Sequence, residues 1–479
     1  MVCSHVFFCL FLLPLFCVLK RQTVKERSRP KQKDTQTVYQ TDLRRTQPTT
    51  RHPDFHATLQ ILVLIWYSNM ETGMEIGFKS RCAAALLAAG LITATHAADI
   101  PGITQWPLAS IQPDHADDRD LQPFAQAIGN ARVVALGEQT HGGAEEFLLK
   151  TRLVKYLHEH MGFDVLLLES GFYDMGRLAT RMEQGEKLDD MAPGNVFYMY
   201  AKSAEGRMLL QYLDHQRALG KPMALAGIDS QHTGALSISD LLPGLQAFLA
   251  KQAPALSTGP GWNAYRQAAQ PLFAMNRAAP NAEARAAFER HAAAIDNALC
   301  ASKDASVGGA AWWCRVSRSV QAQAATYWSG DKNYQRDNAM GDNAIWLADT
   351  LFKGKKIVVW AHTIHVAKGF QRTPENLQAG EVMFRHWGSD YKVAQFTAAD
   401  GDVVEFASMQ PFKIPKPVPG SLEAQLADSG KALLGLSATS PVTLPQSSFD
   451  YAEPMTGRLG QNWDVLFYVR TMTPVHMTR

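Results

Sequence analysis

Four short apolar runs along this chain each end in polar residues of a similar kind. In chain order they are 131–136 before Glu138, 165–168 before Glu169, 223–226 before Asp229, and 357–361 before His362. Each run has the length and composition of a buried parallel strand. Because ligands of open α/β sheets bind outside the carboxyl ends of the strands, we expect these polar residues to meet at one edge of a single sheet.

Amphipathic segments between the apolar runs predict helices. Residues 145–160 and 205–219 carry apolar side chains at helical spacing. The first of these segments follows His141 closely, so we expect that histidine to lie near a helix N-terminus. Two further apolar runs, 392–396 and 465–470, predict strands later in the chain. The alternation predicts an α/β fold with a mostly parallel central sheet flanked by helices.

Residues 236–341 break this alternation. The segment is rich in Ala, has a helical pattern interrupted by five prolines, and shows no strand signal. We interpret it as a helical insertion, or cap, on an α/β core made of residues 98–235 and 342–479. The cap also holds four aromatic residues, which we expect to pack between its helices; the alternative is that they form the wall of an apolar substrate site. They are Trp312, Trp313, Tyr327 and Trp328.

The first hundred residues differ from the rest of the chain. Residues 79–98 give basic residues, an apolar run and small residues in the order of a secretory signal peptide. We therefore expect residues 74–97 to be a signal peptide that is removed near Ala97, and residues 1–73 to be misassigned upstream sequence or a disordered segment. The alternative is a membrane anchor at residues 2–19, which is at the short end for a spanning helix.

Cysteine content agrees with export to the periplasm or beyond the cell, and charge gives the remaining chain no electrostatic reason to lie on a membrane. Residues 1–97 hold 12 Lys and Arg against 6 Asp and Glu, so the remaining chain carries a net charge of −4 although the full sequence carries +2. We expect a monomer that binds no nucleic acid and is not embedded in a membrane. Cys300 and Cys314 are the cysteines that remain. Their spacing suits a disulfide that closes a hairpin of two helices; the alternative is two unpaired buried thiols.

Three imidazoles and three carboxylates would gather at the predicted sheet edge. They are Glu138, His141, Glu169, Asp229, His362 and His365. A neutral imidazole held by a carboxylate can take a proton from water, and fixed donors can stabilise the oxyanion that then forms. The sequence has no Gly-x-Ser-x-Gly motif, so water is the expected nucleophile.

Several motifs in series resemble the erythromycin esterase family. They comprise Gly137-Glu138-x-x-His141-Gly142 with Glu145, Lys150 and Glu169, then Gly227-x-Asp229, Arg336-Asp337 with Met340 and Asn343, Trp360-Ala-His362-x-x-His365, and Gly388-x-x-Tyr391. The resemblance extends from Phe124 to Val469. It implies an α/β fold and a hydrolase that cleaves small-molecule carboxylic esters or lactones. Such a hydrolase uses no metal or other cofactor and activates water with a histidine.

The resemblance also implies roles for individual residues. His141 would be the base, and Glu169 would be the carboxylate that holds its ring. Arg336, His362 and His365 would match positive or donor groups of the pocket. From the chemistry of the residues themselves, we expect Arg336 and His365 to stabilise the oxyanion and Glu138 to orient the turn that leads to His141. We expect the remaining matched residues to contact the substrate, namely His362, Lys150, Asp229 and Glu145.

The chain departs from the family pattern at two positions. Lys150 stands where family members that open macrolides carry Arg, and Thr363 stands where Asn is usual. A lysine is a point charge that cannot form the bidentate pair of an arginine. We therefore expect these departures to affect substrate preference more than hydrolysis itself.

Two other functions are compatible with the sequence. His141, His362, His365 and Glu169 would make a mixed nitrogen and oxygen ligand set for zinc or manganese in a metal-dependent hydrolase. The second alternative is a periplasmic protein that binds a small molecule without turning it over. Such a protein would need fewer ionisable groups at its site.

Overall fold

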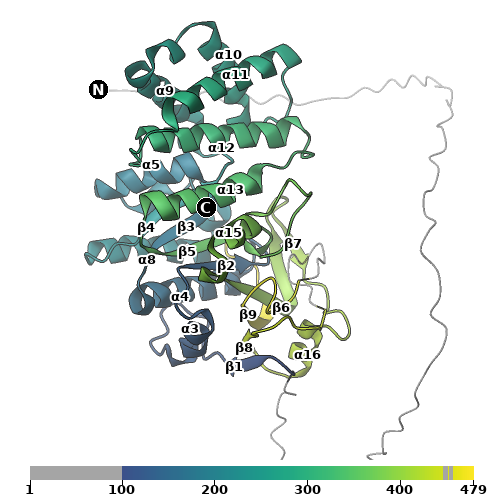
Figure 1. The fold of residues 1–479 in the computed structure, drawn as a ribbon. Helices are drawn as coiled ribbons and strands as arrows, with labels where there is room; N and C mark the ends of the chain where they lie inside the picture. The colour runs from purple at the N-terminus through teal and green to yellow at the C-terminus, as the bar shows by residue number, and fades with distance from the viewer. Residues whose placement is uncertain (1–99, 446–450, 452–456, 479) are drawn as a thin grey trace, which may run out of the picture. The chain divides into compact units, whose positions relative to one another are not determined.

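A nine-stranded sheet organises the part of the chain that this computed structural model describes, which is residues 100–445, 451 and 457–478. The strand order is β1-β8-β9-β6-β2-β5-β3-β4, and β7 pairs with β6 (Figure 1). The strands are β1 (Thr104–Pro107), β2 (Val133–Glu138), β3 (Phe163–Gly171), β4 (Ala224–Asp229), β5 (Lys356–His362), β6 (Tyr391–Glu405), β7 (Gln410–Lys413), β8 (Leu433–Ser437) and β9 (Val465–Met472).

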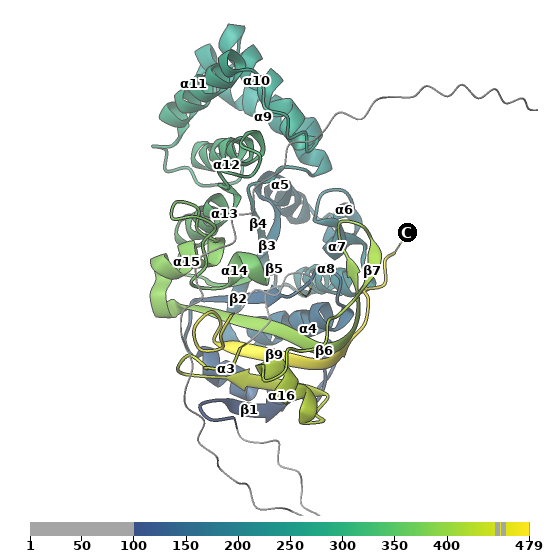
Figure 2. The same cartoon turned by 90° about the vertical axis from the view of Figure 1, so that its right-hand side faces the viewer.

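Helices connect the strands and cover both faces of the sheet (Figure 2). Outside the insertion they are α3 (Gln122–Ile128), α4 (Ala144–Met161), α5 (Phe172–Glu183), α6 (Leu188–Met191), α7 (Tyr198–Lys202), α8 (Ala204–Ala218), α14 (Thr363–Val366), α15 (Ala379–Trp387) and α16 (Leu422–Asp428), with short turns η1 (Arg119–Leu121) and η4 (Gly388–Asp390). The two helices predicted from amphipathic spacing are α4 and α8, so both predictions are confirmed.

The four strands predicted from apolar runs lie next to one another in the order β2-β5-β3-β4, and every pair among them is parallel. β6 and β9 extend the parallel part of the sheet, while β1, β7 and β8 pair antiparallel. In this register Glu138 lies opposite His362, and Gly171 lies opposite Asp229. The mostly parallel sheet is thus confirmed, and the carboxyl ends of its central strands come together at one edge.

Both faces of the central strands are buried, which explains their nearly continuous apolar composition. Successive side chains of a strand point to opposite faces. Val133 and Ala135 of β2 therefore pack in a core that also contains residues of α13 and α15, whereas Val134 and Leu136 pack in a second core with residues of α4 and α8.

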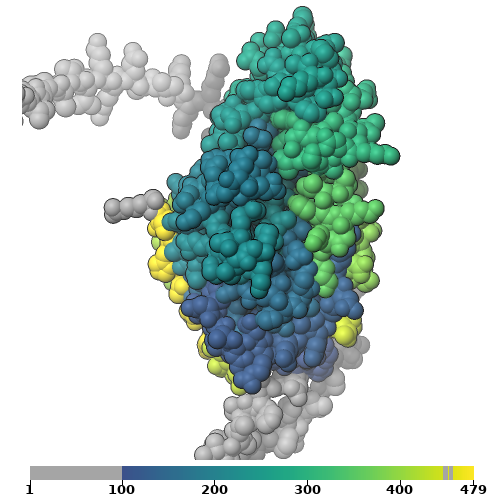
Figure 3. Space-filling model, turned by 90° about the vertical axis from the view of Figure 1, so that its left-hand side faces the viewer, coloured from purple at the N-terminus to yellow at the C-terminus, as the bar shows by residue number. Residues whose placement is uncertain are grey.

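The elements between β4 and β5 are all helices or helical turns. This segment forms α9 (Ala235–Gln252), η2 (Pro254–Leu256), α10 (Gly259–Phe273), α11 (Ala282–Leu299), α12 (Ala310–Trp328), α13 (Arg336–Trp346) and η3 (Leu347–Leu351). In the space-filling view its teal and green residues gather at one end of the described unit, and the blue residues of the first core segment cover the other end (Figure 3).

The aromatic residues of this insertion are buried, as predicted. Trp312 and Tyr327 are each 1% exposed and belong to the core that the insertion shares with the sheet. The Trp312 ring stacks on Phe172 of α5, with ring centroids 5.9 Å apart. Cys300, which follows α11, is bonded to Cys314 in α12. The predicted disulfide between two helices is therefore confirmed, and the alternative of two free thiols is wrong.

The proline-rich segment 411–419 begins within a strand. Residues 410–413 form β7, which pairs antiparallel with the end of β6. β7 pairs with β6 alone and lies off the main path of the sheet. Pro411 is tolerated there because its missing N–H removes no hydrogen bond to a second neighbouring strand. The hairpin of β6 and β7 extends β6 far beyond the predicted 392–396, and its turn carries Phe406.

The predicted signal peptide, the predicted upstream segment and the alternative anchor at 2–19 lie outside the described residues. The chain divides into a segment of residues 1–92 and a unit of residues 93–479. Among the helices of the described part, none is long and apolar enough to cross a membrane.

Candidate active site

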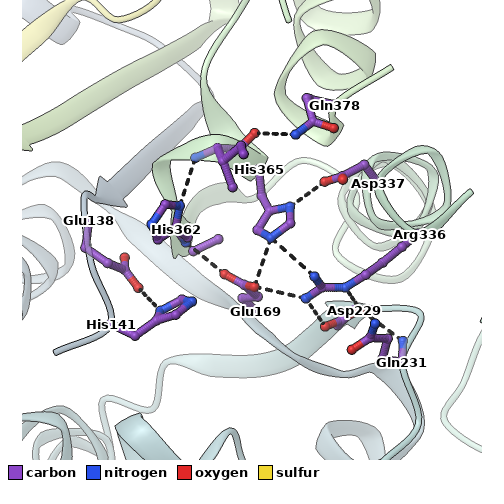
Figure 4. Close-up of polar contacts among 12 residues, drawn as sticks. Glu138, His141, Glu169, Asp229, Gln231, Arg336, Asp337, His362, His365 and Gln378 are labelled. Atoms are coloured by element: carbon purple, nitrogen blue, oxygen red, sulfur yellow. Dashed lines mark hydrogen bonds and ion pairs between the residues drawn. The ribbon is translucent and has the colours of Figure 1, made fainter. Parts of the chain in front are cut away.

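The carboxyl ends of the central strands surround a cavity of about 740 Å³. Among the residues that line it are His141, Glu169, Asp229, Arg336, His362 and His365. The structure therefore brings together residues at or just after the carboxyl ends of β2, β3, β4 and β5 with an arginine from α13 (Figure 4). Apolar residues from elsewhere complete the wall, including Phe197, Met275 and Phe406.

His141 is held by the carboxylate of Glu138, the last residue of β2. Its Nδ1 lies 3.1 Å from Oε1 of Glu138, and the hydroxyl of Tyr200 donates to the same oxygen at 2.8 Å. Nε2 of His141 has no hydrogen-bond partner among the described residues. With Nδ1–H donating to Glu138, the Nε2 lone pair is available to accept a proton.

The turn that carries His141 is packed against the sheet so closely that it needs glycine. A Cβ atom on Gly142 would collide with the carbonyl oxygen of Val404 in β6. The backbone of Gly142 also accepts hydrogen bonds from the N–H groups of Val404 at 3.2 Å and Val475 at 3.0 Å. These contacts fix the loop between β2 and α4, and with it the direction of the imidazole.

Glu138 and Lys150 form a buried ion pair beneath the cavity. Lys150 also points at the carbonyl oxygen of Ala361 at 3.4 Å and lies over the ring of Trp360. Burial tends to raise the pKa of Glu138, but Lys150 and His141 bring it down to about 2. Burial lowers the pKa of Lys150 to about 8 against the attraction of Glu138. Glu138 is therefore an anion at neutral pH, which suits a group that holds an imidazole.

Lys150 does not contact the cavity, so its prediction as a substrate-binding residue is wrong. The side chain is fully buried and reaches from α4 to the underside of Glu138. Thr363 is also buried below the cavity, where its hydroxyl donates to the carbonyl oxygen of Gly137 at 2.5 Å. Both departures from the family pattern thus support the floor of the site and do not line it.

Glu169 does not hold the ring of His141, contrary to the prediction. Its Oε1 lies 3.0 Å from Nη2 of Arg336 and 3.2 Å from Nε2 of His365, and its Oε2 accepts the backbone N–H of His362 at 2.8 Å. β5 lies between β2 and β3, so the end of β3 faces the residues that follow β5. Burial tends to raise the pKa of Glu169, but His365 and the neighbouring cations hold it well below its ordinary value.

Asp229 holds Arg336 in a bidentate pair. Nε of Arg336 donates to Oδ1 at 3.0 Å, and Nη2 donates to Oδ2 at 2.6 Å. The third nitrogen, Nη1, has longer contacts of 3.4 Å to the hydroxyl of Tyr334 and 3.4 Å to Nε2 of His365. Asp229 therefore lines the cavity, but both of its carboxylate oxygens bind Arg336. Nη1 is the guanidinium nitrogen with the longest contacts in the protein.

His365 lies between two carboxylates. Nδ1 bonds Asp337, and Nε2 faces Glu169. Burial opposes the protonated ring, but Asp337 and Glu169 outweigh it and hold the pKa of His365 well above its ordinary value. We missed the role of Asp337, a fully buried residue of α13, although it stands next to Arg336 in a matched motif.

His362 links the turn after β5 to the turn after β2. Its Nε2–H donates to the carbonyl oxygen of Gln139 at 3.0 Å, and its Nδ1 accepts the backbone N–H of Ile364 at 3.1 Å. Burial lowers the pKa of His362 to about 3, so the ring is neutral. This arrangement gives the cavity one neutral imidazole beside His141 and one imidazolium at His365.

Glu145 lies outside the cavity, so its prediction as a substrate-binding residue is also wrong. Its carboxylate accepts from the backbone N–H and the hydroxyl of Thr473, each at 2.7 Å. The next residue, Glu146, is the buried one, and it accepts from the backbone N–H groups of Gln139 at 3.3 Å and Thr140 at 3.2 Å. Burial and the charge of Glu138 raise the pKa of Glu146 to about 8. Its position one helical turn before Lys150 was the signal that could have identified it.

The predicted metal-ligand set is not assembled. Within the described ranges, no three His, Cys, Asp or Glu side chains are grouped so that they could hold a metal ion. Both ring nitrogens of His365 face carboxylates, and both ring nitrogens of His362 are engaged with backbone groups. The geometry therefore matches a network of ion pairs and hydrogen bonds.

Comparison with known proteins points to one family. The model of the erythromycin esterase family matches residues 158–465. The chain is 26% identical over 281 residues to YbfO of Bacillus subtilis (strain 168), a protein named as a hydrolase, and the match covers 53% of this chain and 60% of YbfO. It is 30% identical over 123 residues to erythromycin esterase type II of Escherichia coli, covering 25% of this chain and 29% of that enzyme. The chain thus matches less than two thirds of the length of these relatives.

Solved structures are similar over a larger share of the chain. A protein from Bacillus cereus gives a TM-score of 0.63 at 20% identity, covering 78% of this chain and 97% of its own. A mutant of erythromycin esterase EreC in its open conformation gives a TM-score of 0.58 at 16% identity, covering 77% and 98%. At these identities the similarity establishes the fold.

Proposed function

The chain belongs to the erythromycin esterase family, and on that premise we propose that it hydrolyses carboxylic esters or lactones with a water molecule activated by His141. The observation that carries this proposal is the hydrogen bonding and position of the His141 imidazole. Nδ1 of His141 is bound to the ionised carboxylate of Glu138, and the ring lines a cavity large enough for a drug-sized substrate. Such a dyad can remove a proton from water at neutral pH.

In the proposed reaction, Nε2 of His141 takes a proton from water while the water oxygen attacks the carbonyl carbon of the substrate. The carbonyl oxygen becomes an oxyanion, and the alcohol leaves with the proton that His141 has stored. Nη1 of Arg336 is suited to donate to the oxyanion because its contacts in the protein are long. His365 contributes positive charge through space, since carboxylates occupy both of its nitrogens.

We also propose that the protein is exported. Support comes from the basic, apolar and small residues of 79–98 in signal-peptide order, and from the disulfide between Cys300 and Cys314. N-terminal sequencing of the exported protein should give a first residue near Ala98. A mature N-terminus within residues 1–60 would contradict the proposal.

The substrate can be sought with a panel of esters and lactones. The Escherichia coli relatives are named for erythromycin, so macrolide lactones belong in the panel beside simple lactones and aryl esters. Turnover of a macrolide would point to antibiotic resistance as the physiological role. Hydrolysis of none of these compounds would favour a binding protein without turnover.

The test of the mechanism is His141→Ala. It should lower the rate by roughly 10²–10⁴, the usual contribution of a positioned acid–base group, without loss of the fold. His160→Ala is a matched control because His160 is a half-exposed residue near the end of the helix that follows His141. Unchanged hydrolysis by His141→Ala would show that another group activates water. Activity that is lost on chelation and returns with zinc would favour the metal-dependent alternative.

A further inference from the structure

A second, smaller cavity borders His141. Its volume is about 60 Å³, against about 740 Å³ for the main cavity. His141, His362 and Phe406 line both cavities and form the wall between them. A water molecule takes up about 30 Å³ in the liquid, so the small cavity has room for about two waters but not for an ester substrate.

The wall between the two cavities is made largely of rings. The centroid of the Phe406 ring lies 5.1 Å from that of His141 in an edge-on arrangement, and the His362 ring also lies at 5.1 Å. Phe197 packs on His141 as well, at 4.7 Å. The imidazole of His141 therefore lies among other rings and forms part of the wall. One cavity lies on each side of this wall.

The remaining lining of the small cavity is suited to water. Thr140 supplies a hydroxyl whose oxygen accepts the backbone N–H of Gly142 at 3.2 Å and whose hydrogen remains available to donate. Glu405 supplies a carboxylate from the β6–β7 hairpin, and its oxygens also accept the backbone N–H groups of Ala407 and Ser408. Glu405 and Phe412 line the small cavity and not the large one, and both are partly exposed, so this side of the small cavity lies at the surface. A buried water needs two to four polar partners, which these groups and His141 provide.

We propose that the small cavity is the inlet through which His141 receives its hydrolytic water, separate from the cavity that holds the ester. The proposal rests on the proposed function, since it requires His141 to be the base. An ester whose carbonyl carbon lies near His141 occupies the main cavity and blocks that route for water. A second route allows water to reach the imidazole while the substrate stays bound.

Val403 is the side chain with which to test the inlet. It is 1% exposed, lines the small cavity, and is absent from the wall of the large one. Val403→Ile adds one methylene group and should lower kcat by roughly tenfold with KM unchanged, because substrate binding is not altered. Val403→Ala should widen the inlet. The matched controls are Val469→Ile and Val469→Ala, since Val469 is a valine of the neighbouring strand β9 that is 4% exposed and lines neither cavity.

Methanol is the probe that distinguishes an inlet from simple packing. With para-nitrophenyl acetate, attack by water gives acetate and attack by methanol gives methyl acetate, and His141 removes the proton in both reactions. The ratio of methyl acetate to acetate should rise in Val403→Ala and fall in Val403→Ile, while the Val469 variants keep the wild-type ratio. A ratio that does not respond to Val403, or a change confined to KM, would overturn the proposal.

Two further measurements separate the inlet from its premise. If His141→Ala remains active, the proposed base is wrong; if it is inactive and the ratio ignores Val403, the inlet alone is wrong. A crystal structure of the wild-type protein should show ordered water in the small cavity beside His141, and this result needs no turnover. A dry cavity at a resolution that shows waters elsewhere would count against the inlet.

Discussion

Nδ1 of His141 lies 3.1 Å from Oε1 of Glu138, and the two residues stand only three positions apart, at the end of β2 and in the turn that follows it. The base and the carboxylate that orients it therefore come from one local segment. The residues from the other strand ends, Glu169 and Asp229, serve a different purpose, since they hold His365 and Arg336 on the far side of the cavity (Figure 4). The site thus has a proton-accepting side and a positively charged side.

Glu138→Gln tests the proton-accepting side. The amide keeps the shape of the side chain but loses the charge that stabilises a protonated His141, so kcat should fall by roughly 10²-fold or more. The substitution also leaves Lys150 buried without its counterion, which should cost about 3–5 kcal/mol of unfolding free energy. Steady-state kinetics and urea unfolding measure the two effects.

The double variant Glu138→Gln/Lys150→Met separates these effects. Removing both charges should recover most of the stability, because the unpaired ammonium is gone. Activity should stay low, because His141 still lacks its carboxylate. Recovery of activity together with stability would show that Glu138 matters for folding alone. Glu145→Gln is the control. Glu145 lies in α4, the helix of Lys150, and its carboxylate bonds Thr473 outside the cavity.

Asp337→Asn tests the positively charged side. Without this carboxylate, burial should lower the pKa of His365 and deprotonate it within the working pH range. The imidazolium of His365 favours the oxyanion. The variant should therefore lose activity as pH rises through the lowered pKa of His365, whereas the wild-type protein should keep its activity over this range. A pH–rate profile shows the difference as a new descending limb.

Asp349→Asn is the control for that experiment. Asp349 pairs with His386 at 2.6 Å, which reproduces an Asp–His contact at the surface and away from the cavity. Its pH–rate profile should match that of the wild-type protein. If Asp337→Asn gives a uniformly lower rate with an unchanged profile, Asp337 stabilises the local structure without setting the charge of His365.

The gathering of polar residues at one edge could be predicted from the sequence, because parallel strands end on the same side of a sheet. The pairing of those residues could not. Glu169 was assigned to His141, but β5 separates β2 from β3, and strand order is not encoded in any local pattern. Glu138 was the nearer carboxylate along the chain, and the short connection to His141 decided the contact.

Residues that support the site from helices were the hardest to predict. Glu145 and Glu146 are adjacent in α4, yet successive helical positions point about 100° apart, so one reaches Thr473 and the other reaches the turn of Gln139. Asp337 belongs to the same class, because its contact with His365 joins segments 28 residues apart. The β6–β7 hairpin carries Phe406 to the cavity, and a proline-rich segment gave no signal for that strand pair.

Removal of the disulfide should destabilise the insertion and spare the site. Cys300 and Cys314 are separated by 14 positions, and a closed loop of this size contributes roughly 3 kcal/mol in the chain-entropy model. Cys300→Ser/Cys314→Ser should therefore unfold at a lower urea concentration, with kcat and KM unchanged at low denaturant. Reductant should shift the wild-type curve to that of the variant and leave the variant curve in place. Loss of activity in the folded variant would show that the insertion shapes the cavity through this bond.

Glu146 should make the stability of the protein fall with rising pH. Its pKa in the folded state is about 8, against an ordinary value of 4.5. Between these values the folded state keeps a proton that the unfolded chain has released, so the free energy of unfolding decreases as pH rises, by at most about 1.4 kcal/mol per pH unit from this group. Above about pH 8 both states are ionised, and the slope from Glu146 disappears.

Glu146→Gln isolates this contribution. The amide carries no titrating proton, but it can accept only one of the two backbone N–H groups that Glu146 holds, those of Gln139 and Thr140. The variant should therefore be less stable than the wild-type protein near pH 5, and the difference should shrink steadily towards pH 8. Urea unfolding of both proteins across this range gives the comparison, and Glu145→Gln should run parallel to the wild-type curve. Parallel curves for Glu146→Gln as well would mean that Glu146 is already ionised in the folded protein, with Lys150 balancing two carboxylates instead of one.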